Sequence, residues 1–230
     1  MITLSISNKK YNLPTRLTIK QWKSLVGFDF NDESQWHRIL GSLIGMHPRD
    51  LELADRNSMI LAISFIISIM NGRAEYKVKD FNTLLFGEFV DLDVYVVQGI
   101  EKNMETIVEM LTPEGDEPTV WSDEAMWLID RYTQFRIHTY RSYAGLFGLN
   151  DLEEYEDIED DEDHDPNGIA KGWYKVIIGL ADNNIEKIDY VTEQPLKKVL
   201  NFMSHRKEVQ LEENAKVREQ QRKLAAARNK

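Results

Sequence analysis

Residues 86–111, FGEFVDLDVYVVQGIEKNMETIVEML, carry the clearest structural pattern in this chain. Their large apolar side chains recur every three or four residues, which is the period of an α-helix with one buried face. Pro113 removes a backbone donor and disfavours helix in the residue before it, so the helix should end at Thr112. We predict one long helix over 86–111. The residues that set its period are Phe86, Phe89, Val90, Val97, Ile100, Met104, Ile107, Val108 and Leu111.

Segments on both sides follow the same helical period. One predicted helix ends at Gly45 and Pro48, and it should form a hairpin with a helix over residues 56–70. An aromatic-rich helix is predicted from Ser122, as its N-cap, to about Gly148. Two further helices are predicted, one over residues 173–181 and one that opens near Thr192 and Pro195. The apolar face of the first of these helices is formed by Trp36, Ile39, Leu40, Leu43 and Ile44.

The N-terminus departs from the helical period. Apolar and polar residues alternate from Ile2 to Ile6 and resume at Tyr11, which predicts a small β-hairpin. Thr18 and Gln21 then have the spacing of a capping box at a helix start. The predicted fold class is mainly α: a helical body with a small N-terminal β-hairpin, an acidic loop and a projecting C-terminal helix. The predicted divisions are 1–150 for the hairpin and helical body, 151–168 for the acidic loop, and 169–230 for the C-terminal helices with a basic arm.

Composition excludes several classes of protein. The chain has 230 residues, 42% of them hydrophobic and none of them cysteine. The lack of cysteine excludes disulfide scaffolds, thiolate metal sites and thiol nucleophiles. The most apolar run, residues 59–70, is only about 12 residues long, whereas a membrane-spanning helix needs about 20. We therefore expect a chain with a sizeable core and no membrane partner.

Charge is concentrated in one segment, residues 151–165. This segment holds eleven of the 39 acidic residues, while the remaining 215 residues carry 28 acids and 28 bases. Within it, Asp163 and Asp165, followed by Asn167 and Gly168, match the first half of a calcium-binding loop. The twelfth position is Tyr174 in place of the bidentate glutamate, so these are weak metal candidates. The alternatives are a solvated acidic loop and a mimic of the phosphate track of DNA.

The C-terminal segment has the opposite charge. Residues 204–230 hold eight bases and four acids in a sequence of strong helix formers. Few apolar residues interrupt it, so we predict a helical arm that contacts a partner protein. A second hypothesis is that the acidic loop of one copy receives this arm from another copy, giving a homo-oligomer. The predicted apolar anchors are Leu211, Val217 and Leu224, and the predicted steering charges are Arg218, Arg222, Lys223 and Arg228.

No catalytic motif is present in the sequence. The chain lacks the G-x-S-x-G, phosphate-loop and G-x-G-x-x-G patterns, and its five histidines never form an H-E-x-x-H pair. Asp91 and Asp93 are one of several close acid pairs, and helical spacing assigns them to a polar face. We therefore predict no enzymatic activity and no cofactor, and we do not expect nucleic acid as a partner.

Two quoted stretches resemble a known group of proteins. ITLSISNKKYNLPTRLTIKQWKSLVGFD, residues 2–29, and FNTLLFGEFVDLD, residues 81–93, are similar to small morphogenesis proteins of tailed bacteriophages. The resemblance covers roughly the first 110 residues. It implies a non-enzymatic structural or assembly protein of the tail or connector region, found in the virion or the host cytoplasm, whose partners are other virion or tail proteins. A transient tail assembly chaperone is the alternative.

Overall fold

The structure is mainly helical, as the sequence predicts. The computed structural model describes residues 3–6, 9–45, 47–51, 54–148 and 166–228. It forms two compact units, each built from two chain segments. Unit 1 contains Met1–Lys79 and Gly99–Tyr132, and unit 2 contains Asp80–Gln98 and Thr133–Lys230. These units divide the chain differently from the predicted ranges 1–150, 151–168 and 169–230, because each unit joins two separate chain segments and the boundaries fall within 1–150.

Unit 1 begins with the predicted hairpin. Strands β1 (Thr3–Ile6) and β2 (Lys9–Asn12) pair antiparallel, with Thr3 opposite Asn12. Helix α1 (Ile19–Val26) follows, and its capping box is confirmed. The Thr18 hydroxyl accepts the Gln21 N–H at 3.2 Å, and the Gln21 side-chain oxygen accepts the Thr18 N–H at 3.0 Å. The two bonds satisfy donors that a helix start otherwise leaves open.

Six further elements complete unit 1. The predicted end of α2 is confirmed, because Gly45 adopts the left-handed conformation at φ 69°. The predicted helix over 56–70 is also confirmed as α4. The elements are η1 (Glu33–Gln35), α2 (Trp36–Ile44), α3 (Pro48–Leu51), α4 (Arg56–Met70), α6 (Ile100–Leu111) and the first half of α7 (Ser122–Ser142). Fully buried core residues include Leu25, Ile39, Leu40, Ile66, Ile107, Leu111 and Leu128.

The prediction of one continuous helix over 86–111 is wrong. The stretch forms two helices, α5 (Phe86–Val97) and α6 (Ile100–Leu111), which belong to different units. Gly99 separates them at φ 111° and ψ 118°, a conformation that glycine adopts without the steric penalty of a side chain. Val97 and Ile100 are three residues apart on either side of the break, so the apolar period continues across it. The predicted end at Thr112 is confirmed.

Unit 2 is a set of helices around an aromatic core. Trp173 is its centre, with its ring 5.8 Å from Phe86, 5.9 Å from Phe89 and 6.0 Å from Phe147, each in an edge-on arrangement. Such pairs stabilise beyond the burial of their area. The elements are η2 (Phe81–Thr83), α5, the second half of α7, α8 (Ala144–Phe147), α9 (Pro166–Leu180), η5 (Ile185–Lys187), α10 (Ile188–Thr192) and α11 (Leu196–Arg228).

A buried carboxylate joins three helices of unit 2. Asp93 accepts hydrogen bonds from Arg136 Nε at 2.6 Å, the Tyr140 hydroxyl at 2.8 Å and Trp173 Nε1 at 2.7 Å. Its side chain is 1% exposed. Buried charge is tolerated when it is paired and hydrogen-bonded in this way. The sequence-based assignment of Asp93 to a polar face is therefore wrong, since it lies seven residues after Phe86 on the buried face of α5.

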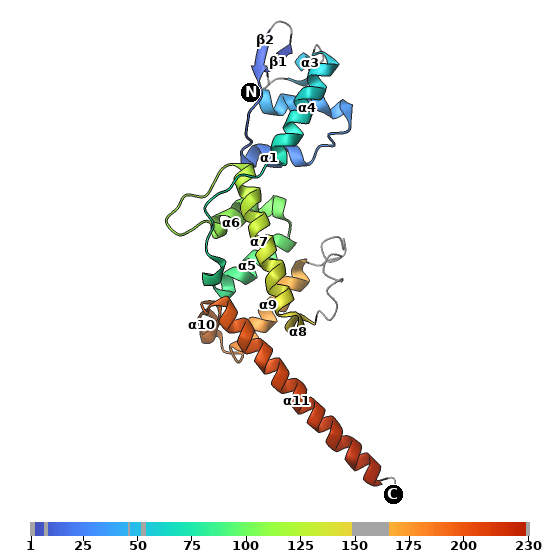
Figure 1. Cartoon of the computed structure of the whole chain (residues 1–230), viewed down its shortest axis with the longest axis vertical. Helices are drawn as coiled ribbons and strands as arrows, with labels where there is room; N and C mark the ends of the chain where they lie inside the picture. The colour runs from blue at the N-terminus through green and yellow to red at the C-terminus, as the bar shows by residue number, and fades with distance from the viewer. Residues whose placement is uncertain (1–2, 7–8, 46, 52–53, 149–165, 229–230) are drawn as a thin grey trace. The chain divides into compact units, whose positions relative to one another are not determined.

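Helix α11 is the predicted projecting C-terminal helix (Figure 1). Its start is fixed because Pro195 precedes it and the Leu196 N–H bonds to the Leu84 carbonyl at 2.9 Å. The side chains of Leu196, Val199 and Leu200 are buried. Every side chain from Glu208 to Lys223 is exposed. The acidic loop, residues 151–165, lies outside the described residues.

Candidate interaction surface

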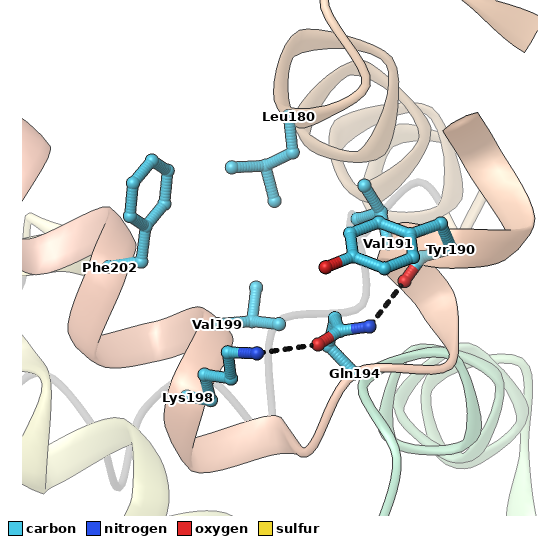
Figure 2. A pocket seen from close by; sticks show the side chains of 7 residues that line it. All are labelled: Leu180, Tyr190, Val191, Gln194, Lys198, Val199 and Phe202. Carbon is cyan, nitrogen blue, oxygen red and sulfur yellow. Dashed lines mark hydrogen bonds between the residues drawn. The ribbon is translucent and has the colours of Figure 1, made fainter.

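A groove opens in unit 2 between α10 and α11, and we call it the α10–α11 groove. Figure 2 shows its lining side chains, which come from the end of α9, from α10 and from the first turns of α11. It holds roughly 330 Å³ and is mostly apolar. Tyr190 and Phe202 flank it and are 65% and 56% exposed. The lining residues are Leu180, Tyr190, Val191, Gln194, Lys198, Val199 and Phe202.

The start of α5 holds the groove in place. The Phe86 N–H donates to the Gln194 carbonyl at 2.8 Å, beside the bond between Leu196 and Leu84. These bonds fix the short link between α10 and α11. Gly87 permits the close approach of α5 to α10, because a Cβ at that position would lie 2.9 Å from the Thr192 Cβ. A glycine at a tight helix contact is thus a condition for the groove.

The polar side chains of the groove satisfy one another. Gln194 Nε2 donates to the Tyr190 carbonyl at 2.9 Å, and Lys198 Nζ donates to Gln194 Oε1 at 2.8 Å (Figure 2). Because the Gln194 amide and the Lys198 ammonium hydrogen-bond to each other, the rest of the lining is mainly aliphatic and aromatic carbon, together with the Tyr190 hydroxyl. A surface of this kind accepts an apolar anchor of another protein, and exposed aromatics are the side chains that dominate such contacts.

Sequence reasoning missed this groove. The sequence predicts an apolar face of the last helix made of Leu196, Val199, Leu200 and Met203. Val199 lines the groove, but this face includes neither Tyr190 nor Phe202. Phe202 follows Val199 by three residues, so the helical period could have shown that this aromatic lies at the edge of the buried stripe. Tyr190 belongs to a five-residue helix that no period reveals.

The predicted partner-binding residues lie on the exposed part of α11. Leu211 is 59% exposed and Val217 is 50% exposed. Arg218 and Arg222 are exposed too. Lys223 pairs with Glu219 one turn earlier, at 2.6 Å. Leu224 and Arg228 belong to the helix, but their side chains lie outside the described residues.

The helix does not bring these residues onto one face. Successive residues turn by about 100°, so residues seven and eleven apart return to nearly the same side. Leu211, Arg218 and Arg222 therefore share one face, which we call the arginine face. Val217 is rotated by about 120° from Leu211 and shares its side with position 224. The predicted set is thus spread over three sides of the helix: the arginine face, the side of Val217 with positions 224 and 228, and the side of Lys223.

A second groove, the α1–α6 groove, lies in unit 1 and holds roughly 350 Å³. One wall of this groove is the segment 118–120. The Ile19 N–H donates to the Val120 carbonyl at 2.8 Å, which fixes this segment against the start of α1. Val120 is 61% exposed at the mouth, while Val108 is buried beneath it. The lining residues are Thr18, Ile19, Lys20, Glu105, Val108, Glu109, Pro118, Thr119 and Val120.

Two carboxylates of α6 border the α1–α6 groove. Glu105 and Glu109 are exposed and one helical turn apart. Lys23 Nζ donates to Glu105 at 2.8 Å. Partial burial raises the pKa of Glu105, but the hydrogen bond and charge of Lys23 lower it by more, so the net shift is downward. Glu105 is therefore ionised at neutral pH, and this groove differs from the α10–α11 groove in having an acidic border.

The calcium candidates fall at the edge of the described chain. Asp163 and Asp165 lie outside the described residues, and Asn167 lies in the first turn of α9 with its side chain outside them. Gly168, which would permit the sharp turn of a calcium-binding loop, is part of helix α9. In the described part of the chain, no three carboxylates or histidines converge as metal ligands would.

None of the described helices combines the length and the apolar character required to cross a bilayer. Comparison of the chain with protein-family models, curated proteins and solved structures finds no match.

Proposed function

We propose that this protein is a non-enzymatic structural or assembly protein of a tailed bacteriophage, acting in the tail or connector region through contacts with other virion or tail proteins. The resemblance of residues 2–29 and 81–93 supplies the class of assembly. The observation that carries the mode of action is the distal half of α11, residues 208–228.

The exposed part of α11 is a surface available to a partner. Most of the stability of helices in proteins comes from packing one face against other residues, rather than from helix propensity alone. Between Glu208 and Lys223 no described side chain is packed in this way. The expected role of the segment is therefore to pack against another protein.

The α10–α11 groove supports the same mode of action from the base of that helix. It presents Tyr190 and Phe202 beside the point where α11 leaves unit 2. A partner that binds residues 208–228 of α11 can place an apolar side chain in the α10–α11 groove at the same time. Two linked contacts bind more tightly than either alone.

Mass spectrometry of purified virions tests the proposal. A fixed copy number per particle supports a virion component. Expression during infection together with absence from particles supports the assembly chaperone. Particles that assemble with normal yield when the gene is deleted would contradict both.

The α10–α11 groove can be tested in a phage that lacks its own copy of the gene and depends on a supplied copy. The double substitution Tyr190→Ala and Phe202→Ala should weaken partner binding by tenfold or more, because exposed aromatics at such sites carry about 2 kcal/mol or more. Ile185→Ala is the matched control, since Ile185 is 80% exposed in the same unit and does not line the groove. Equal particle yields from the two variants would contradict a role for the groove.

A further inference from the structure

We propose that the arginine face of α11 binds a second copy of this chain, on the α1–α6 groove of that copy's unit 1. The inference deepens the proposed function by naming one partner, and it can fail while the proposed function stands. It rests on three observations. Charges of opposite sign have the same spacing on α11 and α6, the α1–α6 groove has an exposed apolar residue at its edge, and the α10–α11 groove carries a lysine in place of acids.

The charges match in sign and spacing. Arg218 and Arg222 are four residues apart on α11, and Glu105 and Glu109 are four residues apart on α6. Four residues of helix advance by about 6 Å, so two helices lying side by side can form both pairs at once. All four side chains are exposed. An arginine can therefore reach Glu109 directly, and the second arginine would share Glu105 with Lys23, which already donates to it at 2.8 Å.

An antiparallel arrangement also engages the apolar residue of the arginine face. With Arg218 opposite Glu109 and Arg222 opposite Glu105, Leu211 lies about 10 Å further along, beyond the C-terminal end of α6. The chain there turns into the segment that carries Val120, which is 61% exposed. Leu211 would cover that side chain.

The charges around the α1–α6 groove favour a basic partner. Lys20 lines it and Lys23 pairs with Glu105, so two bases face the incoming helix. Against them stand Glu105, Glu109 and the acids of residues 113–118. That segment leads from the end of α6 to the groove residues 118–120 and holds Glu114, Asp116 and Glu117. Asp116 pairs with Lys77 at 2.5 Å. Among the residues that line the groove itself, the two acids Glu105 and Glu109 outnumber the single base Lys20.

The α10–α11 groove does not suit the same occupant. Its single charged lining residue is Lys198, which repels an arginine-rich helix. The arginine face therefore discriminates between the two grooves. Because arm and groove are different surfaces, the contact between copies is heterologous and joins them head to tail.

Sedimentation velocity of the purified full-length chain tests the inference. The contact consists of surface ion pairs and one apolar side chain, so self-association should decrease steeply from about 0.01 M to about 1 M salt, where the screening length falls from about 30 Å to about 3 Å. A monomer at every salt concentration would overturn the inference. So would association that salt leaves unchanged.

Charge reversal identifies the surfaces. Arg218→Glu with Arg222→Glu, and separately Glu105→Arg with Glu109→Arg, should each weaken self-association by about tenfold or more. Mixing the two variants should restore it, since each retains one native half and the two reversed halves match each other. Restoration on mixing cannot come from misfolded chains, whereas a mixture that stays monomeric would overturn the proposal.

The control carries the same charge change away from the arginine face. Lys216→Glu with Lys175→Glu reverses one base of α11 about 140° from that face and one exposed base of α9. This variant should still associate at about 0.1 M salt, where charges more than about 10 Å apart are screened. A loss equal to that of the arginine variant would mean that only net charge matters, and would overturn the assignment of the arginine face.

Discussion

The two halves of α11 form one helix but have different surroundings. In the first half, Leu196 and Leu200 are buried in unit 2, and the last contact is Lys207 Nζ donating to the Leu146 carbonyl at 3.0 Å. In the second half every side chain from Glu208 to Lys223 is exposed. One α-helix thus includes a part that packs in the core of unit 2 and a part whose surface is exposed. A continuous helix is therefore not packed along its whole length: the contacts of α11 with the rest of unit 2 reach Lys207, whereas the helix runs on to Arg228.

The largest expected effect concerns the stability of unit 2, in which the first half of α11 is packed. Asp93→Ala should lower the free energy of unfolding of unit 2 by about 3–5 kcal/mol, because it removes the acceptor of three buried hydrogen bonds from Arg136, Tyr140 and Trp173. Denaturant unfolding followed by tryptophan fluorescence measures this loss, with Trp173 as the tryptophan of unit 2 and the other four in unit 1. Asp91→Ala is the control two residues away, where the side chain is exposed and the change should be within about 0.5 kcal/mol. Equal losses would mean that Asp93 does not act through its buried network.

A matched pair of leucines compares the two halves directly. Leu200 is fully buried and Leu211 is 59% exposed on the same helix. Leu200→Ala should cost about 2–5 kcal/mol of stability through lost burial and a cavity, and Leu211→Ala less than about 0.5 kcal/mol. Thermal unfolding of the two variants gives both numbers. A large loss for Leu211→Ala would show that the second half is packed within its own chain.

Two glycines sharpen the account of the junction before α11. Gly87→Ala should destabilise unit 2 by about 1–3 kcal/mol, because the new Cβ would lie 2.9 Å from the Thr192 Cβ. Gly172→Ala in α9 meets no atom within 4 Å and should stabilise by about 0.5–1 kcal/mol, since alanine favours helix. Denaturant unfolding should therefore show a lower free energy of unfolding for Gly87→Ala and a higher one for Gly172→Ala. An unchanged free energy of unfolding in Gly87→Ala would contradict the tight contact between α5 and α10.

The smallest effect is local to the second half. Lys223→Ala removes the pair with Glu219 and should reduce helix stability there by up to about 0.5 kcal/mol. Amide hydrogen exchange near residue 220 resolves this change, while the exchange of residues 196–207 should not change. At about 1 M salt wild type and variant should converge, since the pair is screened. Altered exchange in the first half would show that the halves are coupled.

Local chemistry made much of the fold predictable. The capping box at Thr18, the left-handed Gly45 and the stop at Thr112 are set by residues within a turn of each helix end, so the sequence contains their cause. The break at Gly99 was hidden because the apolar period runs across it. Pairing of distant segments, such as Asp93 with Trp173, depends on tertiary contacts that no short pattern encodes.

The interaction surface was predictable only in part. Basic composition and sparse apolar residues identified the arm, since they are properties of one helix. Treating Leu211 and Val217 as one set ignored the helical rotation that separates them. The α10–α11 groove needs α9, α10 and α11 together, and only the folded unit brings Leu180 to Phe202.

Truncation after Lys207 tests the role of the second half most directly. The shortened chain should unfold within about 0.5 kcal/mol of wild type, because the removed side chains that the structure describes are exposed, yet it should fail to support particle assembly. A loss of several kcal/mol in stability, or particle assembly at the wild-type level, would contradict the assignment of residues 208–228 to partner binding.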